Sequence, residues 1–333
     1  MRDPVNDFDY PDEWVARCKD PDMLNDVIEG TSVLTSSGVA LKRGFTTGTT
    51  ASAACKAAVL SLRRQVSQVD IDIPCGLTVK VEAKGIQGSA LCRKFSGDYP
   101  SDVTSGACFI AEASVCNATT LLPGQGIGRF VRDTPRGSRG SAAISPSAHG
   151  EIMLAIHQAC REIGIPGATV KLEIENGEEL ARRTLNPRMG IEGGISVLGT
   201  TGLVEPWDDH LDKSNEERIA NASRVVLTTG RNGLRYSRLL FPDHEVVLVG
   251  TRVKKALDIA RGDVILAGMP ALILKFIEPN ILKGSGCATV DELVATELGR
   301  ERMNVVLGKG KETYPSVRIV LFDRTGAVIG DTQ

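Results

Sequence analysis

The residues most suggestive of chemistry lie in a glycine-rich stretch, residues 186–206. It holds five glycines, two prolines and three hydroxyl residues, with neither the alternation of a strand nor the period of a helix. Because glycine lets the backbone approach a ligand closely, this composition predicts N–H groups that line a phosphate, carboxylate or nucleotide. The alternative is a tight crossover between elements. The predicted binding residues are Gly193, Gly194, Ser196, Gly199, Thr200, Thr201 and Gly202.

A second candidate cradle is formed by Thr46, Thr47, Gly48 and Thr49. They precede an alanine-rich segment, residues 51–60, which is typical of a helix with threonine as its N-cap. The unpaired N–H groups and the dipole of such a helix end attract anions. The segment lacks both the lysine of a P-loop and the GxGxxG of a dinucleotide fold. A well-capped helix that packs closely on a sheet is the alternative.

Two carboxylates, Asp98 and Asp102, stand in a proline-containing turn with Lys94 before it and Thr104 at its end. Such a loop could hold a base, a cation or a ligand hydroxyl, and we predict Asp98, Asp102 and Thr104 as catalytic residues. Asp and Pro are also ordinary turn formers, so a purely structural turn is the competing interpretation.

Arginines gather in a glycine-rich segment that leads towards the first stretch. A guanidinium group suits bidentate recognition of carboxylate or phosphate, so the cluster indicates a polyanionic small molecule. A solvated charged loop is the alternative. The predicted anchors are Arg129, Arg132, Arg136, Arg139 and Arg188.

A further glycine turn follows an apolar run in the C-terminal part of the chain. It lies where a predicted strand meets a helix, the end of an open α/β sheet that ligands favour. Glycine turns after strands also serve simply to reverse the chain. The predicted binding residues are Thr229, Gly230, Asn232 and Gly233.

Composition excludes several classes of function. A net charge of -2 and 4% aromatic residues do not suit nucleic-acid binding. No apolar run is long enough for a membrane helix, and the acidic N-terminus is unlike a signal peptide, so we expect a cytoplasmic protein, with a homodimer as the default assembly. Eight cysteines without a CxxC pair and four histidines without zinc spacing predict no protein-bound metal.

The expected architecture has two domains. Residues 69–83 predict a hairpin, residues 108–115 and 168–174 predict strands, and residues 147–163 predict a helix. These elements favour an α+β N-terminal domain with a mixed sheet. Apolar runs at 224–229, 246–251, 263–267 and 317–322, separated by helical stretches, favour a smaller α/β, Rossmann-like domain with a mostly parallel sheet. The predicted boundaries are a polar extension at 1–27, the α+β domain at 28–207, a linker at 208–222 and the α/β domain at 223–333.

Four blocks of the sequence resemble one known family, the cobalt-precorrin-5B C(1)-methyltransferases of the anaerobic cobalamin pathway. These are residues 42–49 (KRGFTTGT), the acidic turn at 97–106, residues 124–128 (GQGIG) and residues 184–206. The C-terminal half departs from the Gly-Lys-Leu and Thr-His-Ser runs common in the family, so the roles of those residues are not carried over.

The resemblance implies transfer of a methyl group from S-adenosylmethionine to carbon C-1 of cobalt-precorrin-5B, which gives cobalt-precorrin-6A. It implies that the arginines anchor the carboxylates of a corrinoid precursor and that cobalt arrives with this substrate. For this reaction we expect Asp98 or Asp102 to lie near the sulfonium or a pyrrole N–H. The alternatives are a non-catalytic corrinoid-binding protein and a nucleotide-dependent oxidoreductase or phosphotransferase. Which domain holds the methyl donor is left open by the sequence.

Overall fold

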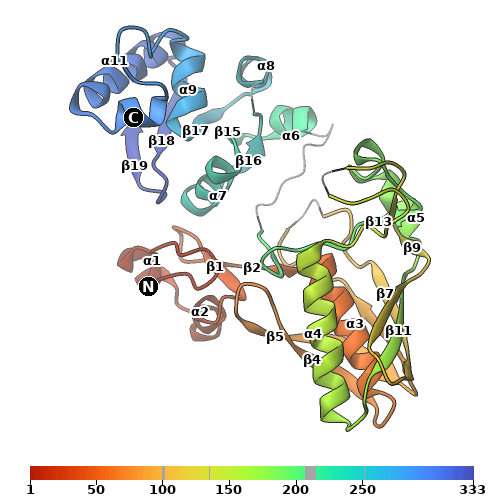
Figure 1. Cartoon of the computed structure of the whole chain (residues 1–333). Coiled ribbons are helices and arrows are strands. Elements are labelled where there is room, and N and C mark those ends of the chain that lie inside the picture. The colour runs from red at the N-terminus through yellow and green to blue at the C-terminus, as the bar shows by residue number, and fades with distance from the viewer. Residues whose placement is uncertain (100–101, 135, 207–214, 251) are drawn as a thin grey trace. The chain divides into compact units, whose positions relative to one another are not determined.

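Two separate sheets organise the chain into two units. The computed structural model describes residues 1–99, 102–134, 136–206, 215–250 and 252–333 (Figure 1). One unit spans Lys42–Pro206, and the other combines Met1–Leu41 with the part of the chain that follows Pro206. Within the described residues, no helix combines the length and the apolar character needed to cross a bilayer.

The Lys42–Pro206 unit contains a six-stranded sheet of order β4-β5-β6-β7-β11-β8. All neighbours are antiparallel except β11 and β8, so the predicted mixed sheet is confirmed. The expected hairpin and the strands at 108–115 and 168–174 are also confirmed. The strands are β4 (Val66–Asp72), β5 (Thr78–Ile86), β6 (Ser89–Arg93), β7 (Cys108–Val115), β8 (Thr120–Pro123) and β11 (Ala168–Ile174).

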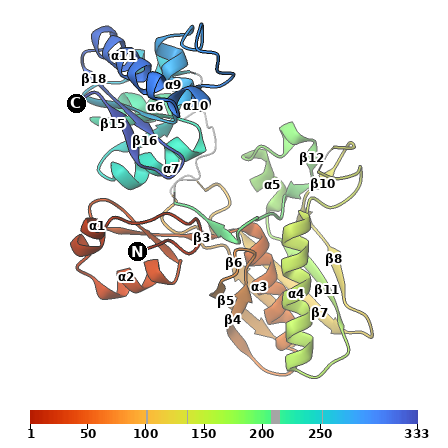
Figure 2. The ribbon, with the colours of Figure 1, turned by 60° about the vertical axis from the view of Figure 1, so that its left-hand side comes forward.

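Two helices, α3 (Thr47–Leu60) and α4 (Pro146–Glu162), are stacked on this sheet (Figure 2). Every residue of α3 is buried, because the helix contacts the sheet on one side and α4 on the other. Gly85 of the sheet permits this close approach, because a Cβ there would lie only 2.7 Å from Ala57 O of α3. The predicted helix over residues 147–163 is confirmed in α4, whose Ile152 and Ile156 are buried.

Short strands join the loops at one end of this unit. They bring together segments that are far apart in the sequence: β13 pairs with β9, β12 with β10, and β14 with β3. The remaining elements are β3 (Gly44–Phe45), β9 (Gly126–Ile127), β10 (Arg129–Phe130), α5 (Gly177–Arg182), the 3-10 helix η1 (Pro187–Met189), β12 (Ile191–Glu192), β13 (Gly194–Ile195) and β14 (Leu203–Val204).

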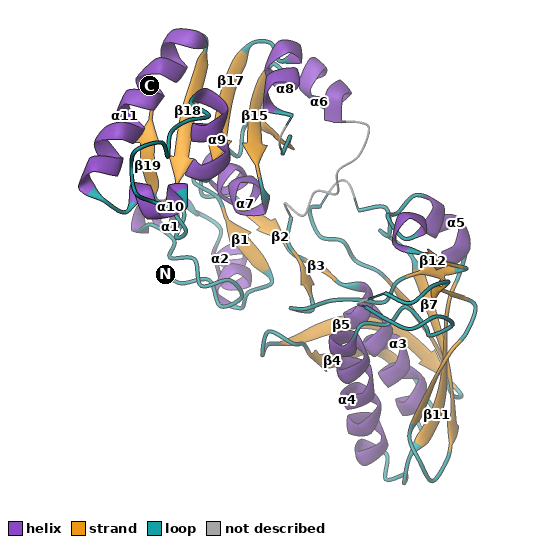
Figure 3. Ribbon diagram, turned by 45° about the horizontal axis from the view of Figure 1, so that its top comes forward, coloured by secondary structure: helices purple, strands orange, loops and turns teal. Residues whose placement is uncertain are grey.

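The second unit contains a five-stranded sheet of order β16-β15-β17-β18-β19, in which only β19 is antiparallel to its neighbour (Figure 3). Three predicted strands recur within one residue of their expected bounds, and the fourth, β16, is shorter. The strands are β15 (Arg224–Thr229), β16 (Glu245–Leu248), β17 (Asp263–Gly268), β18 (Val317–Phe322) and β19 (Val328–Asp331). The helices are α6 (Asn215–Asn221), α7 (Arg231–Leu240), α8 (Val253–Ile259), α9 (Pro270–Ile277), α10 (Val290–Val294) and α11 (Glu297–Thr313).

The N-terminal segment belongs to this second unit, which differs from the expected boundaries. Tyr10, Trp14 and Leu34 are buried in one core with Val226 and Ile265 of the sheet. A parallel sheet needs apolar cover on both faces, and residues 1–41 supply part of it on the face that α7 also covers. The segment is therefore neither a separate extension nor part of the α+β unit. Its elements are α1 (Asp12–Arg17), α2 (Pro21–Ile28), β1 (Ser32–Leu34) and β2 (Ala40–Lys42).

The expected linker at 208–222 is only partly described. Residues 208–214 lie outside the described residues. Residues 215–221 form α6, where the Asn215 side chain donates to Leu248 O at 3.2 Å and Ile219 is buried in the core. This second half is thus a packed helix of the second unit rather than a connection.

Candidate functional site

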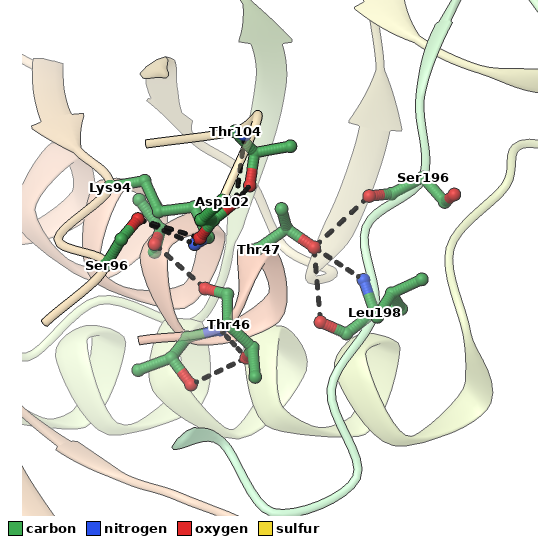
Figure 4. Close-up of polar contacts among 10 residues, drawn as sticks. Thr46, Thr47, Lys94, Ser96, Asp102, Thr104, Ser196 and Leu198 are labelled. Atoms are coloured by element: carbon green, nitrogen blue, oxygen red, sulfur yellow. Dashed lines mark hydrogen bonds and ion pairs between the residues drawn. The ribbon is translucent and has the colours of Figure 1, made fainter. Parts of the chain in front are cut away.

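The two predicted cradles meet at the N-terminus of α3. The Thr47 hydroxyl accepts a hydrogen bond from Leu198 N at 2.9 Å and lies 3.2 Å from the carbonyl oxygens of Ser196 and Leu198 (Figure 4). Gly48 N donates to Leu198 O at 3.0 Å, and the Thr49 hydroxyl donates to Gly202 O at 2.8 Å. The structure therefore brings the threonine cluster (residues 46–49) and the glycine-rich stretch into one region.

The helix end is less open than its sequence suggests. Thr46 is the N-cap, and its hydroxyl accepts from Thr49 N at 3.2 Å, while Gly48 N is taken by Leu198. These two N–H groups are therefore not available to an anion, contrary to the expectation of unpaired donors at this helix end.

Close packing explains two of the glycines in the stretch. A Cβ on Gly199 would lie 2.4 Å from Thr46 Oγ1, and one on Gly202, where φ is +88°, would lie 2.5 Å from Ile73 Cβ. Thr201 belongs to the same contact, since its carbonyl accepts from Cys75 N at 3.1 Å, and Thr200 is exposed beside it.

Replacing Gly199 by alanine is expected to displace the Thr46 cap and to destabilise the protein by about 1–3 kcal/mol, the usual cost of overpacking. Thermal or urea unfolding measures the change. Gly150→Ala on α4 is the matched control, because nothing lies within 4 Å of its added Cβ. Equal stability of the two variants would show that this contact does not constrain the stretch.

The acidic turn is built around Asp102. Its carboxylate pairs with Lys94, accepts from Ser96 Oγ at 2.7 Å, and accepts from the backbone and hydroxyl of Thr104 at 2.9 and 2.6 Å (Figure 4). Burial alone would raise the pKa of Asp102, but the Lys94 ammonium and these hydrogen bonds lower it to about 2. Such a saturated, strongly acidic carboxyl group anchors the turn better than it accepts a proton.

Asp98 holds the same turn from its other side. Its carboxylate accepts from Lys42 N at 2.7 Å, and its own N–H donates to Lys42 O at 2.9 Å. Phe45 N donates to Phe95 O at 2.8 Å, so the turn runs along the strand that leads into Thr46. Both predicted acids thus lie near the threonine cluster, and both accept hydrogen bonds that hold the backbone of the turn and of the strand before Thr46 in place.

The arginine cluster lies against residues 186–194. β10 pairs with β12 through Arg129 opposite Glu192, Val131 N donates to Gly190 O at 2.9 Å, and Arg136 reaches Met189 Sδ at 3.5 Å. All five predicted anchors are exposed, and within the described part of the chain none of them has a carboxylate partner. The predicted proximity of Arg129, Arg132, Arg136 and Arg139 to the stretch that holds Arg188 agrees with this arrangement.

Asn186 forms hydrogen bonds within the glycine-rich stretch. Its buried amide donates to Gly194 O at 3.2 Å and accepts from Ser196 Oγ at 2.8 Å. Gly193 has a φ of +77°, and a Cβ added there would have no atom within 4 Å, so this glycine faces open space.

The predicted residues of the C-terminal turn lie in the other unit. Thr229 ends β15, and Gly230, with φ of +81°, precedes α7, on which Asn232 is exposed and Gly233 packs on Thr228. The hydroxyls of Thr228 and Thr229 are buried and have no hydrogen-bond partner within the described residues. A cavity of about 610 Å³ in this unit is lined by residues that follow β17 and β18, including Met269, Pro270, Asp323 and Arg324.

Sequence reasoning missed two charged residues of the Lys42–Pro206 unit, Arg43 and Glu151. Arg43 is completely buried and pairs with Glu205 at 3.1 Å, which joins the two ends of the Lys42–Pro206 unit. Glu151 on α4 is buried beside Gly48, and burial raises its pKa to about 7. A glutamate in the core-facing register of α4 was the available signal, because Ile152, Ala155 and Ala148 around it are all buried.

The sequence blocks that form this region match a family model, CbiD, over residues 34–206. The chain belongs to the CbiD family. The matched range includes the whole Lys42–Pro206 unit, so the threonine cluster, the acidic turn, the arginine cluster and the glycine-rich stretch all lie within the CbiD match.

Relatives in the CbiD family extend over both units. The chain is 53% identical to a protein of Methanoculleus marisnigri, over 99% of each chain, and 54% identical to one of Methanoregula boonei, over the full length of each. Both are named cobalt-precorrin-5B C(1)-methyltransferase. The crystal structure of the cobalamin biosynthesis protein CbiD from Archaeoglobus fulgidus is 38% identical, with a TM-score of 0.57 over 83% of this chain and 92% of that one. The mixed α/β fold with mixed sheets is therefore that of a CbiD protein.

Proposed function

We propose that this protein methylates carbon C-1 of cobalt-precorrin-5B, with S-adenosylmethionine as methyl donor, to give cobalt-precorrin-6A. The observation that carries the substrate class is the group of five exposed arginines without carboxylate partners among the described residues, gathered beside the glycine-rich stretch. A corrinoid precursor carries several carboxylates that such guanidinium groups can bind. The full-length relatives with this activity in their names support the same reaction.

In this proposal the residues of the Lys42–Pro206 unit have three roles. The arginines hold the substrate carboxylates, and the backbone of residues 193–202 positions the ring beside Thr46, Thr47, Gly48 and Thr49. Asp98, Asp102 and Thr104 keep the adjacent turn in place. Positioning of this kind contributes roughly 7–11 kcal/mol to a reaction between two bound molecules when the geometry is right.

S-adenosylmethionine supplies a methyl group bound to a positively charged sulfur. Its hydroxyls and charged ends need polar partners, and the second unit offers buried hydroxyls without partners at Thr228 and Thr229. β15 is the first strand of this sheet in the sequence, with β16 on one side of it and β17 on the other. Ligands of open α/β sheets bind at the carboxyl ends of the strands at such a point. We therefore propose Thr229, Gly230, Asn232 and Gly233 as donor-binding residues on a Rossmann-like sheet.

The direct test is anaerobic incubation with cobalt-precorrin-5B and S-adenosylmethionine labelled in its methyl group. We expect a product heavier by one labelled methyl group, located at C-1 by NMR. Calorimetric titration with S-adenosylhomocysteine separates the alternatives: a corrinoid carrier would bind the tetrapyrrole alone. Absence of label in the corrinoid would refute the proposed activity. A cytoplasmic location and a homodimer remain predictions.

Replacing Arg139 or Arg188 by methionine is expected to raise the KM for the corrinoid about tenfold each, with kcat nearly unchanged. The reason is that a charge-assisted contact to a carboxylate held equally in ground and transition states affects binding alone. Steady-state kinetics measure the split. Arg64→Met is the control, since Arg64 pairs with Glu162 at the C-terminal end of α4. The anchoring role fails if all three variants have the same KM as the unaltered protein.

A further inference from the structure

Glu151 is a buried carboxylate on α4. It lies in the second turn of α4, only 5% of the residue is exposed, and both side-chain oxygens lack a partner within the described residues. Isolated buried carboxylates are costly, and a neutral side chain of the same shape would avoid the penalty. A group of this kind is a candidate for a role other than packing.

The surroundings of Glu151 explain why it stays unpaired. The groups of α3 that face it are the hydroxyls of Thr49 and Ser52, which are close enough to oppose part of the rise in its pKa. Each hydroxyl has one hydrogen, and these go to Gly202 O at 2.8 Å and Gly48 O at 3.0 Å. The next cation along α3, Lys56, is directed instead to Asp70 O and Gln158 Oε1.

Glu151 lies beside the N-terminal turn of α3, where the two predicted cradles meet. A Cβ on Gly48 would lie 3.4 Å from Glu151 Oε2 and 3.3 Å from Leu198 O, so the carboxylate and the glycine-rich stretch meet at this glycine. Thr49 connects the carboxylate to the helix end, because its hydroxyl is close enough to Glu151 to oppose the rise in its pKa and lies 3.1 Å from Thr46 Oγ1. Two hydroxyls therefore lead from the N-cap of α3 to the carboxylate.

Methyl transfer from a sulfonium donor creates a need for a proton acceptor. The S–CH3 bond breaks with its electron pair left on sulfur, and a C–CH3 bond forms from a π electron pair of the ring. The ring gains one positive charge, which it loses by releasing a proton. We propose that Glu151 accepts this proton through the hydroxyls of Thr46 and Thr49: the Thr49 O–H turns from Gly202 O to the carboxylate, and each hydroxyl passes one proton on and receives one. This inference rests on the proposed function.

The test compares Glu151→Gln with Glu151→Asp in single-turnover methyl transfer between pH 5.5 and 9. The unaltered protein is expected to gain rate with pH through about 7. Glu151→Gln should lose about a hundredfold or more in rate, together with this pH dependence, while Glu151→Asp retains part of both. Glu162→Gln, an exposed glutamate of the same helix, is the matched control.

Two further measurements separate a proton acceptor from a structural residue. The ¹³Cδ resonance of Glu151 should titrate near 7 in the unaltered protein, and S-adenosylhomocysteine should bind Glu151→Gln unchanged. Thr49→Val should slow transfer and Thr49→Ser should preserve it. Transfer by Glu151→Gln within threefold of the unaltered rate, with the same pH dependence, would overturn the inference and leave the proposed function intact. No transfer by the unaltered protein would overturn both.

Discussion

Lys94→Met is expected to lower the free energy of unfolding by about 3–5 kcal/mol at pH 7, the usual cost of removing one partner of a buried ion pair. The Lys94 and Asp102 side chains are 2% and 9% exposed, so the variant leaves a buried carboxylate without its cation. Burial lowers the pKa of Lys94 against the attraction of Asp102, which indicates that the pair itself is costly to bury. The loss thus comes mainly from the stranded Asp102, and urea unfolding followed by circular dichroism measures it.

The double variant Lys94→Met with Asp102→Asn is the decisive control. It removes both charges, keeps the shape of the turn, and should recover most of the stability lost by the single variant. Because the pKa of Asp102 is lowered to about 2 from 3.8, its contribution is complete above 3.8 and is lost as the pH falls through 2. A double variant no more stable than Lys94→Met would show that the ion pair is not what anchors the turn.

Glu151→Gln is expected to stabilise the protein at pH 8 by about 3 kcal/mol and to have almost no effect at pH 4.5. The pKa of Glu151 is raised from 4.5 to about 7 by burial, so the folded protein retains a proton that the unfolded chain releases. Stability from this group is complete below 4.5 and is lost as the pH rises through 7. Glutamine carries no charge and avoids the loss.

Urea unfolding at several pH values checks this second expectation. Glu162→Gln on the same helix should change stability by about 0.5 kcal/mol or less at every pH, since its exposed pair with Arg64 contributes little. A Glu151→Gln protein that is less stable than the unaltered one at pH 8 would mean that the carboxylate is needed by the fold. A gain in stability with a loss of turnover is the signature expected of a functional carboxylate.

Local patterns predicted much of this molecule. The strands at 108–115, 168–174, 224–229 and 317–322 have the predicted bounds, because alternation and apolar runs are properties of neighbouring residues. The alanine-rich segment before Leu60 predicted a closely packed helix for the same reason. The arginine cluster and the glycine-rich stretch were also recognisable from the local composition of the sequence.

Other features depend on contacts between distant residues, which no local pattern contains. Residues 1–26 are polar and acidic on average, yet Tyr10 and Trp14 are buried in the core of the second unit because its sheet needs cover. Asp102 looked like a candidate base, but four donors that converge on it make it an anchor of the turn.

By itself the sequence determined the element types, the two kinds of sheet and the segments that match the family, since these follow from short-range pattern and residue type. Only the tertiary structure decided which of those residues meet and which are already satisfied. Thr47 contacts Leu198 across 151 positions, and Glu151 acquires its raised pKa only when α3 covers it. Burial and hydrogen-bond saturation are collective properties of the packed chain, and they distinguish a reactive carboxylate from a structural one.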